Sequence, residues 1–188
     1  MQSRMLCDSE IKELIENHGF IQNYNPASYA DLPISAGISS VGYDLTLAAS
    51  VYSITEPGTL DPLNFQEHSL TLLPVKKHNG RDVVFMPPKS VALAHSVEWF
   101  NFPANVTGQC VGKSTYARIG VDQFGTPLEP GWSGQVTIEL VNHTNAEAIL
   151  YIGMGILQVQ FFRHKIPDVT YANKQGKYQN QSGVTPAR

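Results

Sequence analysis

The chain has 188 residues, of which 42% are hydrophobic and 15% charged, and its formal net charge is −3 at pH 7. This length can bury a sizeable core, and because no linker-like stretch divides the sequence we expect a single domain over residues 1–188. The slightly acidic balance argues against a general DNA- or RNA-coating protein, which would carry a basic stripe, so no nucleic-acid partner is expected.

The cysteines and the N-terminus bear on the compartment. Cys7 and Cys110 lie far apart and form no disulfide framework, and the first 20 residues lack the apolar core of a signal sequence. No run of 18 apolar residues is present to span a bilayer. We therefore expect a cytoplasmic protein with no membrane partner.

The first 20 residues predict one short helix. Asp8 or Ser9 can cap it, and Gly19 can end it. The apolar stripe of this helix would consist of Ile11, Leu14 and Ile15. Beyond Gly19 the helical periodicity disappears.

Short runs rich in β-branched and aromatic residues fill most of the remaining chain, separated by Pro, Gly, Asn and Asp. These runs span residues 42–54, 68–75, 82–88, 90–100, 105–112, 134–144 and 148–164. Many short strands at this spacing predict a barrel, a sandwich or a jelly roll.

Residues 110–121 read "CVGKSTYARIGV", which raises the question of a phosphate-binding P-loop. Gly108 lies one residue too close to Gly112 for that motif, and the glycines and prolines that follow allow no long helix. Two cations and two hydroxyls are left that could donate charge-assisted hydrogen bonds to a polyphosphate, or could be an ordinary solvated turn. They are Lys113, Ser114, Thr115 and Arg118.

Two carboxylates are candidates for acid–base chemistry. The alternation of "VTIEL" places Val136, Ile138 and Leu140 on one face of a strand, with Thr137 and Glu139 on the other. A half-buried Glu139 facing a cleft would have a raised pKa suited to a general base. The alternative is a solvent-facing glutamate on an exposed sheet. Glu129, in the turn ten residues earlier, is the second carboxylate, and turn carboxylates are commonly just solvated.

Metal and serine-hydrolase signatures are missing from the sequence. No histidine begins an H-x-E, and there is no Cys-x-x-Cys, so the zinc deaminase pattern is absent and we expect no zinc. A G-x-S-x-G elbow is also absent.

The segment 170–188 is polar and punctuated by glycine, with little to bury. It predicts a segment that is disordered or ordered only on binding. It is either a frayed terminus or a flexible lid, in which Tyr171 would contact a small ligand and Lys177 would reach its phosphates.

Five segments, in this order, resemble the dCTP deaminase branch of the dCTP deaminase/dUTPase family. They are "SSVGYDLTL", "DPLNF", "GKSTYARIGV", "EPGWSGQVTIELVN" and "GKYQNQSGV", spanning residues 39–184. The resemblance implies a distorted β-barrel or jelly-roll-like subunit with a short N-terminal helix, assembled as a homotrimer with shared active sites. It further implies zinc-independent deamination of dCTP to dUTP and ammonia, Mg²⁺ on the triphosphate, and dTTP as a candidate inhibitor.

The resemblance also implies two sets of site residues. The catalytic set is Glu139, Arg118 and Ser114. The substrate-binding set is Lys113, Ser114, Thr115, Arg118, Thr126, Glu129, Tyr171, Lys177 and Gln181. Since no metal lowers the pKa of the attacking water, a carboxylate such as Glu139 must accept and return its proton.

One segment departs from the family pattern, and rival functions remain open. Residues 122–125 read "DQFG" where the family is more apolar, so the substrate range could extend to dCMP, or the change could be neutral drift. Gly125 would make this segment looser than a valine would. One rival is a dUTP diphosphatase that uses Glu129, alone or after deamination. The other is a catalytically idle nucleotide-binding protein.

Overall fold

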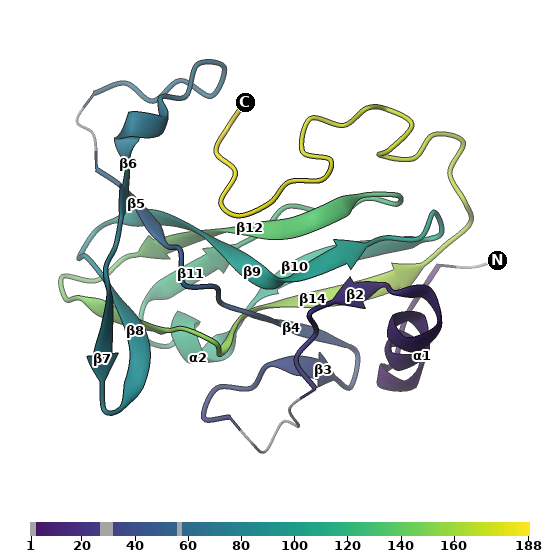
Figure 1. Ribbon diagram of the computed structural model, residues 1–188, viewed down its shortest axis with the longest axis horizontal. Helices are drawn as coiled ribbons and strands as arrows, with labels where there is room; N and C mark the ends of the chain where they lie inside the picture. Colours follow the sequence, from purple (N-terminus) through teal and green to yellow (C-terminus); the bar gives the residue numbers. More distant parts are fainter. Residues whose placement is uncertain (1–2, 27–31, 56–57) are drawn as a thin grey trace.

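Antiparallel strands form most of the regular secondary structure, as Figure 1 shows. The computed structural model describes residues 3–26, 32–55 and 58–188. Every pair of hydrogen-bonded strands named in it is antiparallel. The mainly β prediction is confirmed, although the described strands make three open sheets and no closed barrel.

The strands divide among these three sheets. The first contains β1 (Arg4–Met5), β3 (Gly37–Ser39), β4 (Gly42–Thr46), β10 (Val106–Gly112) and β14 (Gly155–Arg163). The second contains β2 (Ile21–Gln22), β5 (Tyr52–Ile54), β6 (Leu70–Leu72), β9 (Val91–Asn101), β11 (Val121–Phe124) and β12 (Ser133–Asn142). The third contains β7 (Val75–His78), β8 (Arg81–Met86) and β13 (Ala148–Tyr151).

Two predicted runs are each divided between sheets. Residues 42–54 form β4 in the first sheet and β5 in the second, and residues 148–164 form β13 and β14 around a turn in which Gly153 has a φ of 76°. A continuous apolar run therefore supplies two layers of the fold, because each half faces the shared core.

The N-terminal helix α1 (Asp8–His18) buries the predicted stripe of Ile11, Leu14 and Ile15 and ends at Gly19, whose φ is 59°. The predicted cap at Asp8 or Ser9 is wrong: Cys7 is the N-cap. The Cys7 backbone N–H donates to the Glu10 carboxylate at 3.4 Å, and Arg4 holds that carboxylate at 2.6 Å. The helix start is thus fixed by a carboxylate in its first turn.

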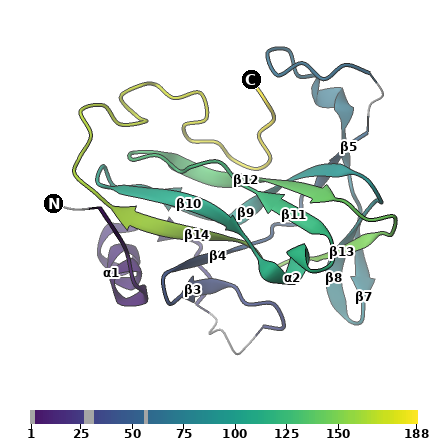
Figure 2. The ribbon, with the colours of Figure 1, turned by 180° about the vertical axis from the view of Figure 1, so that it is seen from behind.

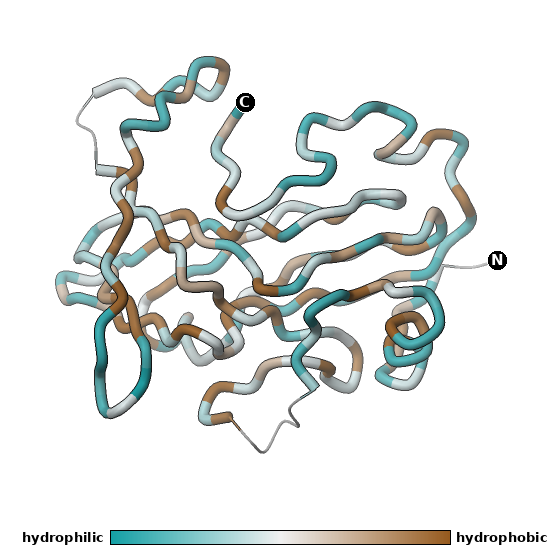
Figure 3. The backbone as a smooth tube through the Cα atoms, in the orientation of Figure 1, coloured by the Kyte–Doolittle hydropathy of each residue, from teal (hydrophilic) through white to brown (hydrophobic). Residues whose placement is uncertain are grey.

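Four phenylalanines lie at the centre of the core, where the first two sheets and α1 meet. The Phe20 ring lies edge-on to Phe102 and to Phe161, with 5.0 Å between centroids in both cases. Phe100, which is also fully buried, packs against all three. Each such ring contributes about 1.5–3 kcal/mol through burial alone. Figure 3 shows hydrophobic segments along the strands and mainly hydrophilic ones along the tail.

Strand β12 connects this core to the surface where a site is expected. Its residues alternate strictly between buried and half-buried. Val136, Ile138 and Leu140 are buried in the core, while Thr137 and Glu139 are on the opposite face, as predicted. The C-terminal tail runs back over β12 (Figure 1).

Two short helices complete the described elements, η1 (Glu67–Ser69) and α2 (Ser114–Ala117). Within the described ranges no helix has the length and apolar character needed to cross a membrane.

Candidate active site

A cavity of about 550 Å³ lies between the outer face of β12 and the C-terminal tail. Its size is in the usual range for small-molecule sites, about 300–1,000 Å³. Five of the predicted site residues line it: Thr126, Glu129, Glu139, Tyr171 and Gln181. The structure therefore gathers polar groups from three separate stretches of the chain around one space.

Glu139 is at the base of this cavity because β12 alternates. Leu93 on β9 and Phe124 on β11 are its direct neighbours across the sheet. Burial among these groups raises the pKa of Glu139 above its ordinary value, since the charged form loses solvation. A half-buried carboxylate on a rigid strand can accept a proton and return it.

Cys110 on β10 lies close enough to Glu139 to interact electrostatically with its carboxylate. Burial and the Glu139 carboxylate together raise the pKa of the Cys110 thiol to about 12. Its Sγ lies 3.6 Å from the Thr126 carbonyl. The thiol therefore stays protonated beside Glu139 and acts as a weak donor to the turn that borders the cavity.

The turn at 126–129 is pinned to β10 by a reciprocal pair of backbone hydrogen bonds. Gly108 and Leu128 exchange N–H and C=O at 2.9 Å in both directions. Glu129, at the end of this turn, forms an ion pair with Lys174 of the tail, with 3.3 Å between the charged atoms. Glu129 is thus held at the cavity rim between the turn and the tail.

The tail itself is packed, unlike the expectation that it has little to bury. Gln135 donates its N–H to the Gln181 carbonyl at 3.0 Å, and the Gln181 amide donates back to the Gln135 carbonyl at 2.7 Å. Trp132 Nε1 donates to the Tyr178 carbonyl at 2.9 Å, and Thr185 is buried. The tail therefore adds a parallel bridge to the start of β12 and covers the cavity.

Tyr171 and Lys177 occupy different positions in this tail. The Tyr171 hydroxyl accepts the N–H of Tyr178 at 3.0 Å and so closes a loop of the tail over the cavity. Lys177 is exposed and does not line the cavity; its ammonium contacts the Arg188 carbonyl and lies 5.9 Å from the centroid of the Tyr178 ring.

The Gly-Lys-Ser-Thr segment does not reach this cavity in the single chain. Ser114, Thr115 and Arg118 are exposed on α2 and its C-terminal cap, and none of them lines the cavity. In Figures 1 and 2, which look at the molecule from opposite sides, the tail lies above β12 and α2 lies below it. The helix has four residues, in line with the sequence argument against a P-loop.

Lys113 has a different environment from its neighbours. Its ammonium forms an ion pair with Asp44 at 2.6 Å and bonds the Ser35 hydroxyl at 2.7 Å. The Lys113 side chain is 10% exposed and that of Asp44 is 1% exposed. The ammonium expected to bind phosphate is instead neutralised by Asp44 inside the subunit, away from the cavity.

Gly125 is tightly confined, contrary to the expectation that it loosens its segment. A Cβ at this position would lie 2.7 Å from Cys110 Sγ and 3.0 Å from Leu157 Cδ2. The missing side chain is therefore explained by close packing beside the cavity.

Thr137, Phe124 and Cys110 are site neighbours that were not among the predicted site residues. Thr137 lies two residues from Glu139, so the two-residue period of a strand already predicts that both side chains are on the same face. Phe124 and Cys110 reach Glu139 only through strand pairing and packing, for which a single sequence has no local signal.

Comparisons with known proteins agree with this architecture. The fold is similar to the crystal structure of 2'-deoxycytidine 5'-triphosphate deaminase from Agrobacterium tumefaciens, with a TM-score of 0.66 and 14% identity over 87% of this chain. The present chain spans about half of that protein, 49% of its length. At this identity the likeness defines the fold class, a mainly β, jelly-roll-like subunit.

Sequence relatives define the family. The chain is 41% identical over 185 residues to a dCTP deaminase of Herpetosiphon aurantiacus, with 97% of both chains covered. It is 43% identical over 188 residues to a dCTP deaminase of Chlamydia abortus, with 95% of both covered. Residues 5–164 match the family model described as dCTP deaminase-like. The chain belongs to this dCTP deaminase-like family.

Proposed function

We propose that the protein hydrolyses dCTP to dUTP and ammonia, with Glu139 as the proton-transferring base. The observation that carries this proposal is the half-buried Glu139 with its raised pKa at the base of a cavity large enough for a nucleotide moiety. Membership of the dCTP deaminase-like family supports the choice of substrate. The two free cysteines suit a reducing cytoplasm, where we place the activity.

The proposed reaction uses Glu139 twice. Glu139 removes a proton from water as the water oxygen bonds to C4 of cytosine, and this proton is returned to N3 of the ring. The added hydroxyl then gives its proton through Glu139 to the amino group, the C4–N bond breaks and ammonia leaves. Proton transfers of this kind contribute about 10²–10⁴-fold to a rate.

The second part of the proposal is a homotrimer with shared active sites. The α2 segment presents its polar groups to solvent beside exposed apolar side chains: Val111, Ile119 and Phe124 are 38%, 51% and 51% exposed. Exposed apolar side chains of this size, next to the exposed polar side chains of α2, favour contact with another subunit. Ser114 and Arg118 of one subunit would then orient the water and the Glu139 carboxylate of the next, and Thr115 would bind phosphate oxygens.

Substrate binding in this proposal requires the tail to change partners. Glu129 and Thr126 would contact the sugar side of the nucleotide, and Tyr171 would lie against it. Gln181 currently donates to the Gln135 carbonyl, and Lys177 contacts the Arg188 carbonyl. Both would exchange these bonds for phosphate oxygens as the tail opens and recloses as a lid.

Mg²⁺ would enter with the triphosphate. The described residues contain no group of three or more His, Cys, Asp or Glu side chains placed to hold a metal ion. The proposal needs no such group, because Mg²⁺ commonly binds through substrate phosphates with few protein ligands. When bound, the ion would neutralise phosphate charge. We also propose dTTP as an inhibitor that occupies the same site.

Chromatography of the products tests this function. The purified protein would be incubated with Mg²⁺ and dCTP, dCMP or dUTP, and a parallel dCTP reaction would contain dTTP. Formation of dUTP with ammonia from dCTP is expected. Turnover of dCMP would show that the substrate range includes the monophosphate. A mixture of dUTP and dUMP from dCTP would indicate a bifunctional enzyme.

Two results would overturn the assignment. If dCTP is untouched while dUTP yields dUMP and pyrophosphate, Glu129 is the working carboxylate. If no nucleotide turns over but dCTP binds, the protein is a nucleotide-binding protein without this activity. Glu129→Gln is the matched control, because it removes the other cavity carboxylate and leaves Glu139 in place.

A further inference from the structure

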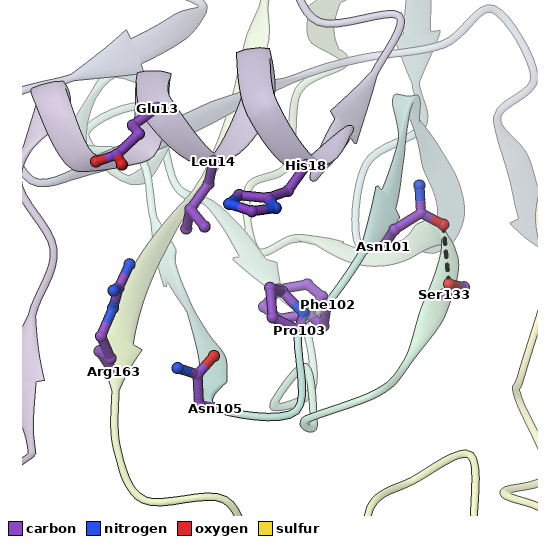
Figure 4. A pocket seen from close by; sticks show the side chains of 9 residues that line it. All are labelled: Glu13, Leu14, His18, Asn101, Phe102, Pro103, Asn105, Ser133 and Arg163. Atoms are coloured by element: carbon purple, nitrogen blue, oxygen red, sulfur yellow. Dashed lines mark hydrogen bonds between the residues drawn. The ribbon is translucent and has the colours of Figure 1, made fainter.

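A second cavity, of about 450 Å³, lies under helix α1 and shares no lining residue with the candidate active site. Figure 4 shows its walls. Helix α1 contributes Leu14 and His18 from above, the β9–β10 turn contributes Phe102 and Asn105 from below, and Arg163 enters from the end of β14.

Arg163 is the unusual group in this cavity. Its Nε is buried and has no hydrogen-bond partner in the described part of the chain, and none of the ion pairs found there includes it. Arg4 provides a contrast, because it is paired with Arg163 across β1 and β14 yet its guanidinium bonds Glu10 at 2.6 and 2.7 Å. Buried donors are ordinarily satisfied, and the Arg163 Nε is an exception. The terminal nitrogens of the guanidinium are not among the buried atoms without a partner, so they are the donors that stay open to an acceptor in the cavity.

The surroundings of Arg163 offer further polar groups. Asn105 lies next to it in space, because Val106 pairs with Arg163 in the sheet and the Asn105 carbonyl accepts the His164 N–H at 2.9 Å. In Figure 4 the Arg163 side chain extends toward α1 on the side of the cavity where Glu13 and Asn105 also lie. On the other side, Asn101 and Ser133 already bond each other at 3.0 Å.

The remaining lining sets the shape of a suitable ligand. Leu14 and Phe102 are core residues whose edges form an apolar wall, and Pro103 continues it. A guanidinium and an amide beside an apolar wall suit an oxyanion attached to a flat or apolar body. The Glu13 carboxylate disfavours a highly charged polyanion such as a nucleoside triphosphate.

We propose that this cavity is a binding site for a small molecule that carries one carboxylate or phosphate group, held by Arg163 and Asn105, with an apolar part against Leu14 and Phe102. The site is separate from the candidate active site and does not depend on the deaminase assignment. Carboxylates and phosphate monoesters share the oxyanion that the guanidinium recognises, and the test separates them.

Isothermal titration calorimetry on the full chain, without nucleotide and at constant ionic strength, is the first test. The probes are benzoate, phenyl phosphate and the neutral benzyl alcohol. We expect benzoate, phenyl phosphate or both to bind, and Arg163→Gln to weaken that binding at least tenfold. Arg4→Gln is the matched control and should retain it. The proposal fails if wild type binds neither anion with a Kd below about 10 mM. It also fails if Arg163→Gln binds as wild type does, or if benzyl alcohol binds equally well.

Asn105→Asp keeps the proposal testable if Arg163→Gln does not fold. The new carboxylate lies next to the guanidinium and takes the place of the ligand's anion, so anion binding should be lost while dCTP turnover is unchanged. Undiminished benzoate or phenyl phosphate binding in Asn105→Asp would overturn the assignment.

Discussion

Lys113 and Asp44 form a buried ion pair, with 2.6 Å between Nζ and Oδ2, that ties the start of α2 to strand β4. Ser35 donates to the same carboxylate oxygen at 2.9 Å, and Gln158 donates to the other at 3.1 Å. The carboxylate is thus saturated with donors, and it fixes the position from which Ser114, Thr115 and Arg118 extend.

Asp44→Asn should therefore destabilise the protein by about 3–5 kcal/mol, because it leaves the Lys113 ammonium buried without a counter-charge. Urea unfolding at a fixed protein concentration measures this change. Asp82→Asn is the control: it breaks the exposed Lys77–Asp82 pair, which is 2.9 Å long, and should cost less than about 1 kcal/mol. Equal effects of the two substitutions would contradict the structural role of Asp44.

Glu139→Gln should retain the fold and nucleotide binding but lose at least about 10²–10⁴-fold in dCTP turnover, because the amide cannot take up the proton. Steady-state kinetics and dCTP titration measure the two properties. Glu129→Gln should affect KM more than kcat. Near-wild-type turnover in Glu139→Gln would remove Glu139 from the mechanism.

The raised pKa of Glu139 predicts the acid side of the pH–rate profile. The base must be deprotonated, so turnover should fall with decreasing pH at values above the ordinary Glu pKa of about 4.3. An acid limb at or below that ordinary value would show that the burial of Glu139 does not govern catalysis.

The same shift has a consequence for stability. The folded state binds the Glu139 proton more tightly than the unfolded state, so this stabilising contribution is complete below the unfolded pKa and is lost as pH rises through the folded pKa. Since Glu139→Gln removes this dependence, its Tm relative to wild type should increase with pH across that window. Differential scanning calorimetry at several pH values tests the sign, and a constant or falling difference would contradict it.

The proposed sharing of active sites between subunits predicts complementation between inactive variants. Arg118→Gln and Glu139→Gln subunits, denatured and refolded together, should form some sites with both residues intact. Random trimers would recover about a quarter of wild-type turnover, since half of the subunits contribute each intact residue. The two variants mixed without subunit exchange are the control. No recovery despite verified exchange would place both residues within one subunit.

The close packing at Gly125 predicts that even an alanine side chain at this position lowers the stability of the fold. Gly125→Ala should lose about 1–3 kcal/mol of stability, because its Cβ would meet Cys110 Sγ at 2.7 Å. The loss should shrink in a Cys110→Ala background, which removes that sulfur. Gly112→Ala, whose Cβ would meet Gln123 atoms at an ordinary 3.5 Å, is the control in the same unfolding assay. An equally mild effect of Gly125→Ala would contradict the packing argument.

The local features of this protein are readable from its sequence, because they depend on neighbours within a few residues. The stripe of α1, its end at Gly19 and the alternation that turns Glu139 away from the core follow from helix and strand periods. The resemblance between motifs likewise identified the family, which the comparisons confirm.

The bonding partners of the polar groups depend on the tertiary fold. Asp44 neutralises Lys113 across 69 residues, the tail docks along the start of β12, and Cys110 fills the space that Gly125 leaves. These contacts depend on strand register and on the order of strands in each sheet, which short-range periodicity does not specify. The family resemblance placed Arg118 and Glu139 in one site. In the folded subunit only Glu139 lines the cavity. That Arg118 of a second subunit reaches Glu139 is a prediction.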